Sequence, residues 1–232
     1  MMEKFKKALI VGAGSGLSAS LARKFAAEGL EVALAARNPD KLAQLCRETG
    51  AISFAVDAAD PDEVAGLFDA VDATLGAPDV VVYNASFRVR GPFETLEADK
   101  VARTLAVTAY GAFLVAQQAV RRMLPNNHGA VLLTGASAGV KGYKQSAPFA
   151  MGKFALRGMA QSMARELSPQ GIHVAHFVID GGIRSGARPE DTQNPDSLLD
   201  PAAIADSYWH VLNQPRSAWA WEIELRPWVE NF

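Results

Sequence analysis

Two side chains in residues 146–167 have types and a spacing that bear on proton chemistry. Lys153 follows Phe149 by four residues in a segment of helical pattern, and residues four apart leave the same face of a helix. A lysine that shares a helix face with a tyrosine could serve proton transfer, but phenylalanine has no hydroxyl group. If this helix faces a reactive site, the proton must come from another residue.

A second candidate site is the stretch ALIVGAGSGLSASLARKFAAEG, which has the pattern of a strand, a glycine-rich turn and a helix. Glycines at such a turn let backbone N–H groups approach a pyrophosphate, whose charge the helix N-terminus favours. The spacing G-x-G-x-x-G does not fit from Gly12, because Leu17 holds the last position; the frame Gly12-x-x-x-Gly16, followed by Ser18, fits better. A tight corner without a ligand is the alternative interpretation.

The end of the next predicted strand distinguishes between two dinucleotides. Dinucleotide folds place an acid about 20 residues past the glycines to bind the adenosine ribose, or an arginine nearby to accommodate a 2′-phosphate. Here the strand ends in Ala35-Ala36-Arg37-Asn38, without a carboxylate. Because Arg37 can form a forked contact with a phosphate, NADP(H) is favoured over NAD(H). The alternative is that Arg37 is a solvated residue at the entry of a helix.

Elements that would position these residues follow from the alternation of short apolar runs and helical patterns. The runs are KALIVGA, EVALAAR, AISFAVD, PDVVVYNA, GAVLLTGA and IHVAHFVID, and the helical patterns cover 17–28, 39–48, 61–75, 97–124 and 146–167. Strands this uniformly apolar are buried on both faces, which indicates a parallel sheet between layers of helices. We therefore expect an α/β fold: one doubly wound, Rossmann-type domain over residues 1–232 with a mostly parallel sheet.

The C-terminal part departs from this alternation. Residues 184–199 are rich in Pro, Asp, Gly and Asn, and we expect them to form a mobile loop beside the substrate. Residues 200–232 would then close the fold with a helix, for which Asp200 is a plausible N-cap, and with a final strand in AWAWEIELRP.

Composition excludes several classes of function. The chain has 232 residues, of which 49% are hydrophobic and 21% charged, and a net charge of −2, which leaves no electrostatic footprint for nucleic acid or an anionic membrane. No stretch approaches the length of a membrane span, and the apolar run at 8–12 is too short for a signal peptide. One cysteine, Cys46, and no Cys/His cluster predict no disulfide and no metal, and a cytoplasmic location is simplest.

In their order along the chain, these pieces resemble the short-chain dehydrogenase/reductase family over nearly the full length. VGAGSGLS resembles the family's glycine turn, YNAS resembles its N-A-G motif, and DGGIRS resembles the loop P-G-x-[IV]-x-T after the sixth strand. The resemblance implies that Asp57 contacts the adenine and that Ile183 meets the nicotinamide carboxamide. The residues assigned to cofactor binding are Gly12, Ser15, Gly16, Leu17, Arg37, Asp57, Asn84, Ala85, Lys153 and Ile183.

The family's active site contains an asparagine, a serine, a tyrosine and a lysine, and by resemblance only the lysine is kept, as Lys153. Thr108, Ala136 and Phe149 stand at the other three positions. Loss of a positioned general acid typically costs about 10²–10⁴ in rate, so the family's usual carbonyl chemistry should be severely impaired.

Two residues could replace the missing donors. Ser137 could reach the pocket if the end of its strand shifts by one residue, because a regular strand would point it to the opposite face. Tyr143 lies on the loop before the helix and could supply a phenol, or could simply form part of the pocket wall. Thr108 could order a water molecule in place of the asparagine.

Three functions remain open at this point. The first is an NADP(H)-dependent oxidoreductase with altered proton-donor chemistry, acting on a small molecule with an activated carbon–carbon double bond or imine. The alternative is a catalytically degenerate NADP(H)-binding sensor or scaffold, and the third is a homologue with a purely structural role. Arg88, Arg90 and Arg184 could line a pocket for an acidic substrate, although single arginines usually lie on the surface. By resemblance, apolar-striped helices at 101–123 and 149–167 imply a homodimer or homotetramer.

Overall fold

The computed structural model describes residues 4–230, so the ends of the predicted domain, 1–3 and 231–232, lie outside the described residues. Its centre is one seven-stranded sheet with the order β3-β2-β1-β4-β5-β6-β7. Every neighbouring pair of strands is parallel, which confirms the doubly wound architecture. The strands are β1 (Lys7–Val11), β2 (Glu31–Ala36), β3 (Ile52–Ala55), β4 (Val80–Tyr83), β5 (Gly129–Thr134), β6 (Ile172–Ile179) and β7 (Glu222–Leu225).

Burial of the strands explains their uniformly apolar sequences. Every residue of β4, β5 and β6 is buried, because helices cover both faces of the sheet. Successive side chains of a strand enter opposite layers: Ile10 of β1 packs in one hydrophobic core, and its neighbour Leu9 packs in the other.

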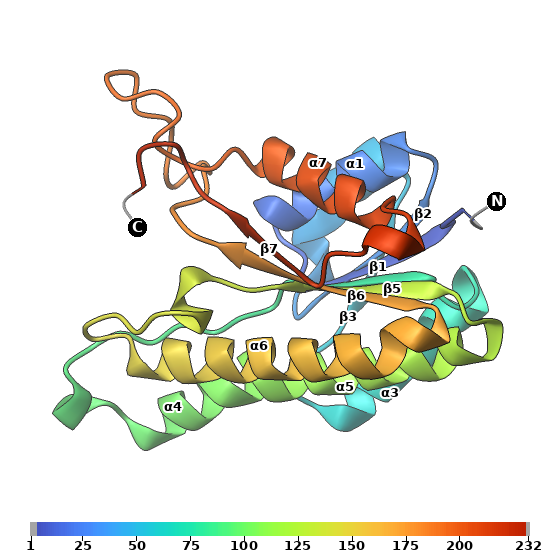
Figure 1. The fold of residues 1–232 in the computed structure, drawn as a ribbon, viewed down its shortest axis with the longest axis horizontal. Coiled ribbons are helices and arrows are strands. Elements are labelled where there is room, and N and C mark those ends of the chain that lie inside the picture. Colours follow the sequence, from blue (N-terminus) through green and yellow to red (C-terminus); the bar gives the residue numbers. More distant parts are fainter. Residues whose placement is uncertain (1–3, 231–232) are drawn as a thin grey trace.

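The helices form one layer on each face of the sheet (Figure 1). One layer contains α1 (Leu17–Ala27), α2 (Ala43–Thr49) and α7 (Pro201–Leu212). The other contains α3 (Pro61–Thr74), α4 (Ala98–Leu105), α5 (Gly111–Met123) and α6 (Ala147–Leu167). Phe25 and Tyr208 are among the largest buried side chains of the first layer, and Phe68 is among those of the second.

Helix starts show which predicted caps form. Asp200 Oδ1 accepts a hydrogen bond from the Ala202 N–H at 2.9 Å and caps α7, as predicted, with Pro201 in the first turn. By contrast, Gly16 at the start of α1 offers no side chain to cap that helix. The first turn of α1 therefore directs uncapped N–H groups toward the end of the sheet.

Two predicted helices differ from the pattern. The segment expected at 39–48 begins with a 3₁₀ turn, Pro39–Leu42, before α2. The segment expected at 97–124 consists of α4, a π-helical turn at Ala106–Tyr110, and α5. A π-helical turn inserts a residue into the helix and displaces its neighbours from regular hydrogen bonding. Here the Val107 carbonyl accepts a hydrogen bond from the Tyr83 hydroxyl at the end of β4. The turn thereby joins this helix to the edge of the sheet where the candidate site lies.

Residues 184–199 form a loop whose ends are tied together. Ile183 and Leu199 pair in a parallel bridge, and Ser185 and Arg188 pair in an antiparallel one. The Arg184 guanidinium forms ion pairs with Glu190 at 3.0 Å and Asp200 at 2.8 Å, which holds the loop against the start of α7. Within residues 4–230, no helix is long and apolar enough to cross a bilayer.

Candidate active site

The glycine-rich turn after β1 lies directly against the chain that leaves β4. Gly12 has φ +86°, a conformation that L side chains rarely adopt. A Cβ atom at Gly12 would lie 2.3 Å from the Ala85 nitrogen, so no side chain fits there. The close approach of the two backbones thus requires glycine at this position and brings Ala85 into the site.

Asn84 holds this turn in place. Its backbone N–H donates to the Val11 carbonyl at 2.8 Å, and its side-chain amide donates to Ser18 Oγ at 2.7 Å. Ser18 in turn donates to the Gly12 carbonyl at 3.0 Å. This chain of hydrogen bonds connects the ends of β1 and β4 to the first turn of α1.

A cavity of about 680 Å³ opens between this turn and the ends of β2, β3 and β4, and we call it the first cavity. It lies beside β1, where the strand order reverses, which is the place where doubly wound sheets bind ligands. Its volume falls within the range of about 300–1,000 Å³ that is usual for small-molecule sites. The structure therefore has a cavity of suitable size at the glycine-rich turn, where the sequence predicts a nucleotide site.

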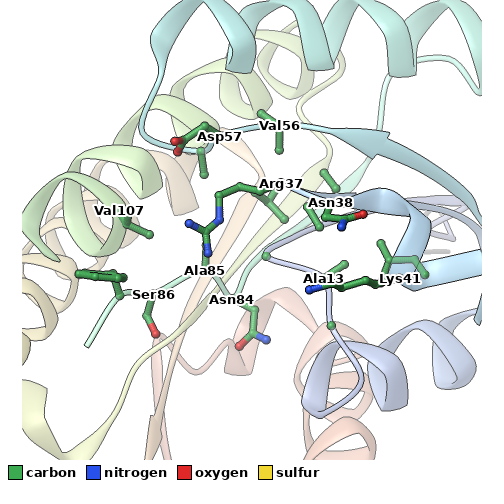
Figure 2. A pocket seen from close by; sticks show the side chains of 18 of the residues that line it. Ala13, Arg37, Asn38, Lys41, Val56, Asp57, Asn84, Ala85, Ser86 and Val107 are labelled. Atoms are coloured by element: carbon green, nitrogen blue, oxygen red, sulfur yellow. The ribbon is translucent and has the colours of Figure 1, made fainter. Parts of the chain in front are cut away.

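Arg37 stands at the end of β2, and its guanidinium group projects into the first cavity (Figure 2). Within residues 4–230, its side chain forms no hydrogen bond or ion pair with another residue. Asn38 and Lys41, from the turn that follows, also line the cavity. Within residues 4–230 neither Arg37 nor Lys41 forms an ion pair, and two such cations beside an amide suit the recognition of a phosphate group.

Asp57 lines the opposite side of the first cavity and is not free. Its carboxylate accepts hydrogen bonds from the Arg103 guanidinium at 2.5 Å and the Ala59 N–H at 3.0 Å. Burial by itself would raise the pKa of Asp57, but these two donors outweigh it and bring the pKa below its usual value. With Arg37, Lys41 and Arg103 against this one carboxylate, the charged groups of the first cavity favour an anionic ligand.

Three further residues assigned to the cofactor differ in their placement. Ser15 lines the first cavity, and Gly16 begins α1. The side chain of Leu17 is 5% exposed, packs in the core and lines neither cavity. Any contact that Leu17 makes with a bound nucleotide must therefore come from its main chain.

A second cavity of about 630 Å³ adjoins the first and shares Asn84 and Ser86 with it. It brings together the residues to which the sequence assigned chemistry. Its lining includes Ser137, Tyr143, Phe149, Lys153 and Ile183.

Lys153 is buried at the base of the second cavity. Its Nζ donates a hydrogen bond to the Thr134 carbonyl at 2.7 Å and lies 5.7 Å from the centre of the Phe149 ring. Burial lowers the pKa of Lys153 to about 8, because the charged ammonium is removed from water. The predicted shared helix face of Phe149 and Lys153 therefore opens onto the site.

Ser137 reaches the second cavity by a route that differs from the one-residue shift expected. β5 ends at Thr134, and the chain passes through Ala136 into a single 3₁₀ turn, Ser137–Gly139. Strand alternation therefore no longer decides the direction of the Ser137 side chain. The Tyr143 hydroxyl donates a hydrogen bond to Ser137 Oγ at 2.8 Å, so these two residues form a hydroxyl pair in the cavity wall.

Thr108 is fully buried and lines neither cavity. Its hydroxyl oxygen accepts a hydrogen bond from the Phe87 N–H at 3.4 Å, and a Cβ atom at Gly152 would lie 2.9 Å from Thr108 Cβ. These contacts favour a packing role for Thr108 between α6 and the chain after β4.

Other residues of the site were not recognised in the sequence. Lys41 and Arg103 line the first cavity, and Arg188 lines the second. Of the three arginines considered for an acidic ligand, Arg88 and Arg90 line the second cavity, but Arg184 does not because it pairs with Glu190 and Asp200. Lys41 could have been assigned to the first cavity from its position four residues after Arg37. That Arg188 lines the second cavity and Arg184 does not depends on the course of the loop.

Known proteins resemble this chain in sequence and in fold. The family model described as short chain dehydrogenase matches residues 6–195. A protein of Escherichia coli (strain K12), named cyclic-di-GMP-binding biofilm dispersal mediator protein, is 33% identical over 201 residues, which cover 86% of this chain and 82% of that protein.

Two solved structures extend this comparison to the fold. A short-chain dehydrogenase from Rhodopseudomonas palustris has a TM-score of 0.84 at 35% identity and covers 97% of this chain and 100% of its own. A metagenomic short-chain oxidoreductase in complex with NADP has a TM-score of 0.84 at 26% identity, covering 96% and 97% respectively.

Proposed function

The chain belongs to the short-chain dehydrogenase family, and we propose that it is an NADP(H)-dependent oxidoreductase that takes its proton from the Ser137–Tyr143 hydroxyl pair. One observation carries this proposal. The cavity beside the glycine-rich turn shares Asn84 and Ser86 with an adjoining cavity, which is lined by a buried lysine and a hydrogen-bonded pair of hydroxyl groups. A nucleotide in the first cavity could therefore extend its reactive ring into the second.

The first cavity supports the choice of NADP(H). The turn is open at Gly14 and Gly16, where an added Cβ atom would meet nothing within 4 Å, so a pyrophosphate could lie next to the N-terminus of α1, where the helix dipole favours negative charge. Arg37 and Lys41 would bind the 2′-phosphate, and Lys153 would bind the ribose next to the nicotinamide. A relative of 26% identity was solved in complex with NADP. When bound, NADPH supplies a hydride.

The hydroxyl pair would provide the matching proton. Ser137 Oγ accepts the hydrogen bond of Tyr143, so its own hydrogen is available to an oxygen or nitrogen atom of the substrate. As Ser137 gives up this proton it takes the one from Tyr143. Tyr143 is 41% exposed and can regain a proton from water, so charge is balanced after each turnover.

The remaining wall restricts the chemistry. Phe149 and Ala136 can neither donate a proton nor bond to an oxygen atom, whereas hydride delivery requires only that the substrate be held at the correct angle and distance. We therefore expect activated carbon–carbon double bonds and imines to be reduced faster than simple ketones.

A second candidate function is a binding protein that holds NADP(H) without turnover. It is favoured by the same absence of a donor at positions 136 and 149. The name of the Escherichia coli relative also states a binding role, toward cyclic-di-GMP, and no reaction. The two candidates differ only in whether the hydroxyl pair transfers a proton.

Fluorescence titration with NADPH and NADH tests the cofactor, and a panel of ketones, enones and imines then tests turnover. We expect NADPH to bind more tightly than NADH, and Arg37→Ala to weaken NADPH binding about 10- to 100-fold, the value of charged hydrogen bonds, with little effect on NADH. Arg47→Ala, at an exposed position of α2, is the matched control. Binding without turnover of any substrate would select the binding protein, and no binding of either dinucleotide would refute both.

Association into a homodimer or homotetramer forms part of the proposal. Four large apolar side chains of α6 and the adjoining helix are exposed: Tyr110, Phe113, Met151 and Phe154. Apolar exposure of this kind on neighbouring helices is typical of a contact surface. Light scattering on the Phe113→Glu variant should then give a smaller particle than the unchanged chain, whereas equal masses would place the contact elsewhere or exclude it.

A further inference from the structure

One wall of the second cavity is strongly cationic. Arg88 and Arg90 come from the chain after β4, and Arg188 comes from the loop at 184–199, so two distant segments bring guanidinium groups to the same cavity. None of the ion pairs formed within residues 4–230 involves these three arginines. Neighbouring Arg184, which does not line the cavity, is paired with two carboxylates.

Phe149 provides a platform for one of these arginines. The Arg88 guanidinium carbon lies 4.8 Å from the centre of the Phe149 ring, within the range of a cation–π contact. Burial, followed by repulsion from Arg90 and Arg188, lowers the pKa of Arg88 from its usual value. The ring that replaces the family's tyrosine thus holds a cation next to the site, close to other cations, and this arrangement is electrostatically unfavourable without an anion.

The carboxylates of the cavity do not balance this charge. Asp180 is buried in the lining and lies 3.5 Å from both Lys141 and Arg226, so its charge is already compensated from outside the cavity. Glu230 lines the mouth and forms no ion pair with the three arginines. Lys153 adds a further cation at the base.

We propose that the substrate is a small anion, whose carboxylate or phosphate group is bound by Arg88, Arg90 and Arg188 while its reducible bond faces Ser137. The placement of the reducible bond at Ser137 rests on the proposed function, whereas the binding of the anion does not. Guanidinium groups bind carboxylate and phosphate through paired, charge-assisted hydrogen bonds, and three of them around one cavity can surround such a group. The anion would thereby hold the rest of the substrate at a fixed distance from the hydroxyl pair.

Calorimetric titration of the protein saturated with NADP⁺ tests this inference, because the phosphates of the cofactor then occupy the first cavity. The probes are phenyl phosphate, benzoate and the neutral benzamide, which share a ring and differ in charge. We expect both anions to bind at least about tenfold more tightly than benzamide. Tighter binding of phenyl phosphate would assign a phosphorylated substrate, and tighter binding of benzoate would assign a carboxylic acid.

Variants then locate the binding group. Arg88→Gln, Arg90→Gln and Arg188→Gln should each weaken the better anion about tenfold or more, and Arg88→Lys should recover part of the loss. Arg165→Gln, at an exposed position near the end of α6, is the matched control and should bind normally. NADP⁺ affinity should change much less than anion affinity in all of them, because none of the three lines the first cavity, where the cofactor's phosphates would bind.

Two results would overturn the inference: equal binding of benzamide and benzoate, or anion affinities that do not depend on the three arginines. If the unchanged protein fails to bind NADP⁺, the proposed function fails separately. The same titration on the Arg37→Ala variant, which lacks the main cation of the first cavity, then still decides whether the arginines of the second cavity bind an anion.

Discussion

The two adjoining cavities differ in what forms their walls. The first is built from main-chain geometry and a few charges: Gly12 packs against Ala85, Asn84 donates a hydrogen bond to Ser18, and Arg37 forms no ion pair within residues 4–230. In the second, Ala136 and Phe149 offer no hydroxyl group at the positions where the family resemblance leads us to expect one, and Ser137 and Tyr143 form a hydrogen-bonded hydroxyl pair in its wall. A site formed by closely packed backbone tolerates few substitutions. A proton donor can come from any residue whose hydroxyl group reaches the reacting atoms.

We expect cofactor binding and proton transfer to be separable, so that changes in one cavity leave the other unaffected. Lys153 is the exception, because it stands at the base of the second cavity on the helix that faces the expected nicotinamide site.

Restoration of the family's donors should have the largest effect. The double variant Phe149→Tyr with Ala136→Ser places a phenol one helical turn before Lys153 and a hydroxyl at the cavity wall. We expect ketone reduction with NADPH to rise by about 10²–10⁴, the contribution of a positioned general acid. Steady-state assays measure the rise, with Phe154→Tyr, on the exposed side of α6, as the control. A folded, NADPH-binding but inert double variant would show that these positions do not face the reacting bond.

Removal of the hydroxyl pair should lower the activity of the chain, by a smaller factor than the rise expected from the double variant. Ser137→Ala and Tyr143→Phe should each lower kcat about 10²-fold, and the combination should lower it little further, because the two groups act in series. NADPH affinity should not change. Losses that multiply in the combined variant would instead indicate two independent contributions.

The turn of the first cavity can be broken with one methyl group. Gly12→Ala introduces a Cβ atom 2.3 Å from the Ala85 nitrogen at a φ of +86°, and we expect it to cost at least about 2 kcal/mol of unfolding free energy. Gly14→Ala is the matched control, since a Cβ there meets nothing within 4 Å. Denaturant titration compares them, and equal stability of the two variants would mean that the backbones do not approach this closely.

Lys153 gives the smallest predicted effect, in the dependence of stability on pH. Its pKa in the folded state is lowered to about 8, so between that value and its ordinary pKa the unfolded chain binds more protons. Stability from this group is therefore gained as pH rises and lost as pH falls. Without cofactor, the unchanged chain should gain about 1 kcal/mol relative to Lys153→Met between about pH 7 and about pH 9. Parallel profiles would indicate that Lys153 titrates normally.

Much of the fold followed from the sequence. The uniformly apolar runs predicted a buried parallel sheet, and Asp200 predicted the start of α7, because both depend on local patterns. The interruption of the helix at 97–124 could not be predicted. The π-helical turn is contacted by the Tyr83 hydroxyl, which donates a hydrogen bond to the Val107 carbonyl from a distant strand, and local sequence patterns do not report such a contact.

The candidate site was predictable to the same degree. The place of Arg37 in the first cavity could be predicted because it follows the glycine turn at the spacing known from dinucleotide folds, whereas Arg188 lines the second cavity only through the course of a loop. The prediction for Ser137 assumed that β5 continued past Thr134, and the 3₁₀ turn that replaces it has no clear signal in the sequence. Long-range contacts decide such details.

We propose that the chain binds NADP(H) in the first cavity and takes its proton from Ser137 and Tyr143 in the second. A crystal structure of the NADP⁺ complex tests this most directly. We predict that the 2′-phosphate lies within hydrogen-bond distance of the Arg37 guanidinium, and that the hydroxyl pair of Ser137 and Tyr143 provides the side-chain hydroxyl nearest to the nicotinamide C4 atom. A 2′-phosphate in solvent away from Arg37, or a different hydroxyl beside the C4 atom, would contradict the account.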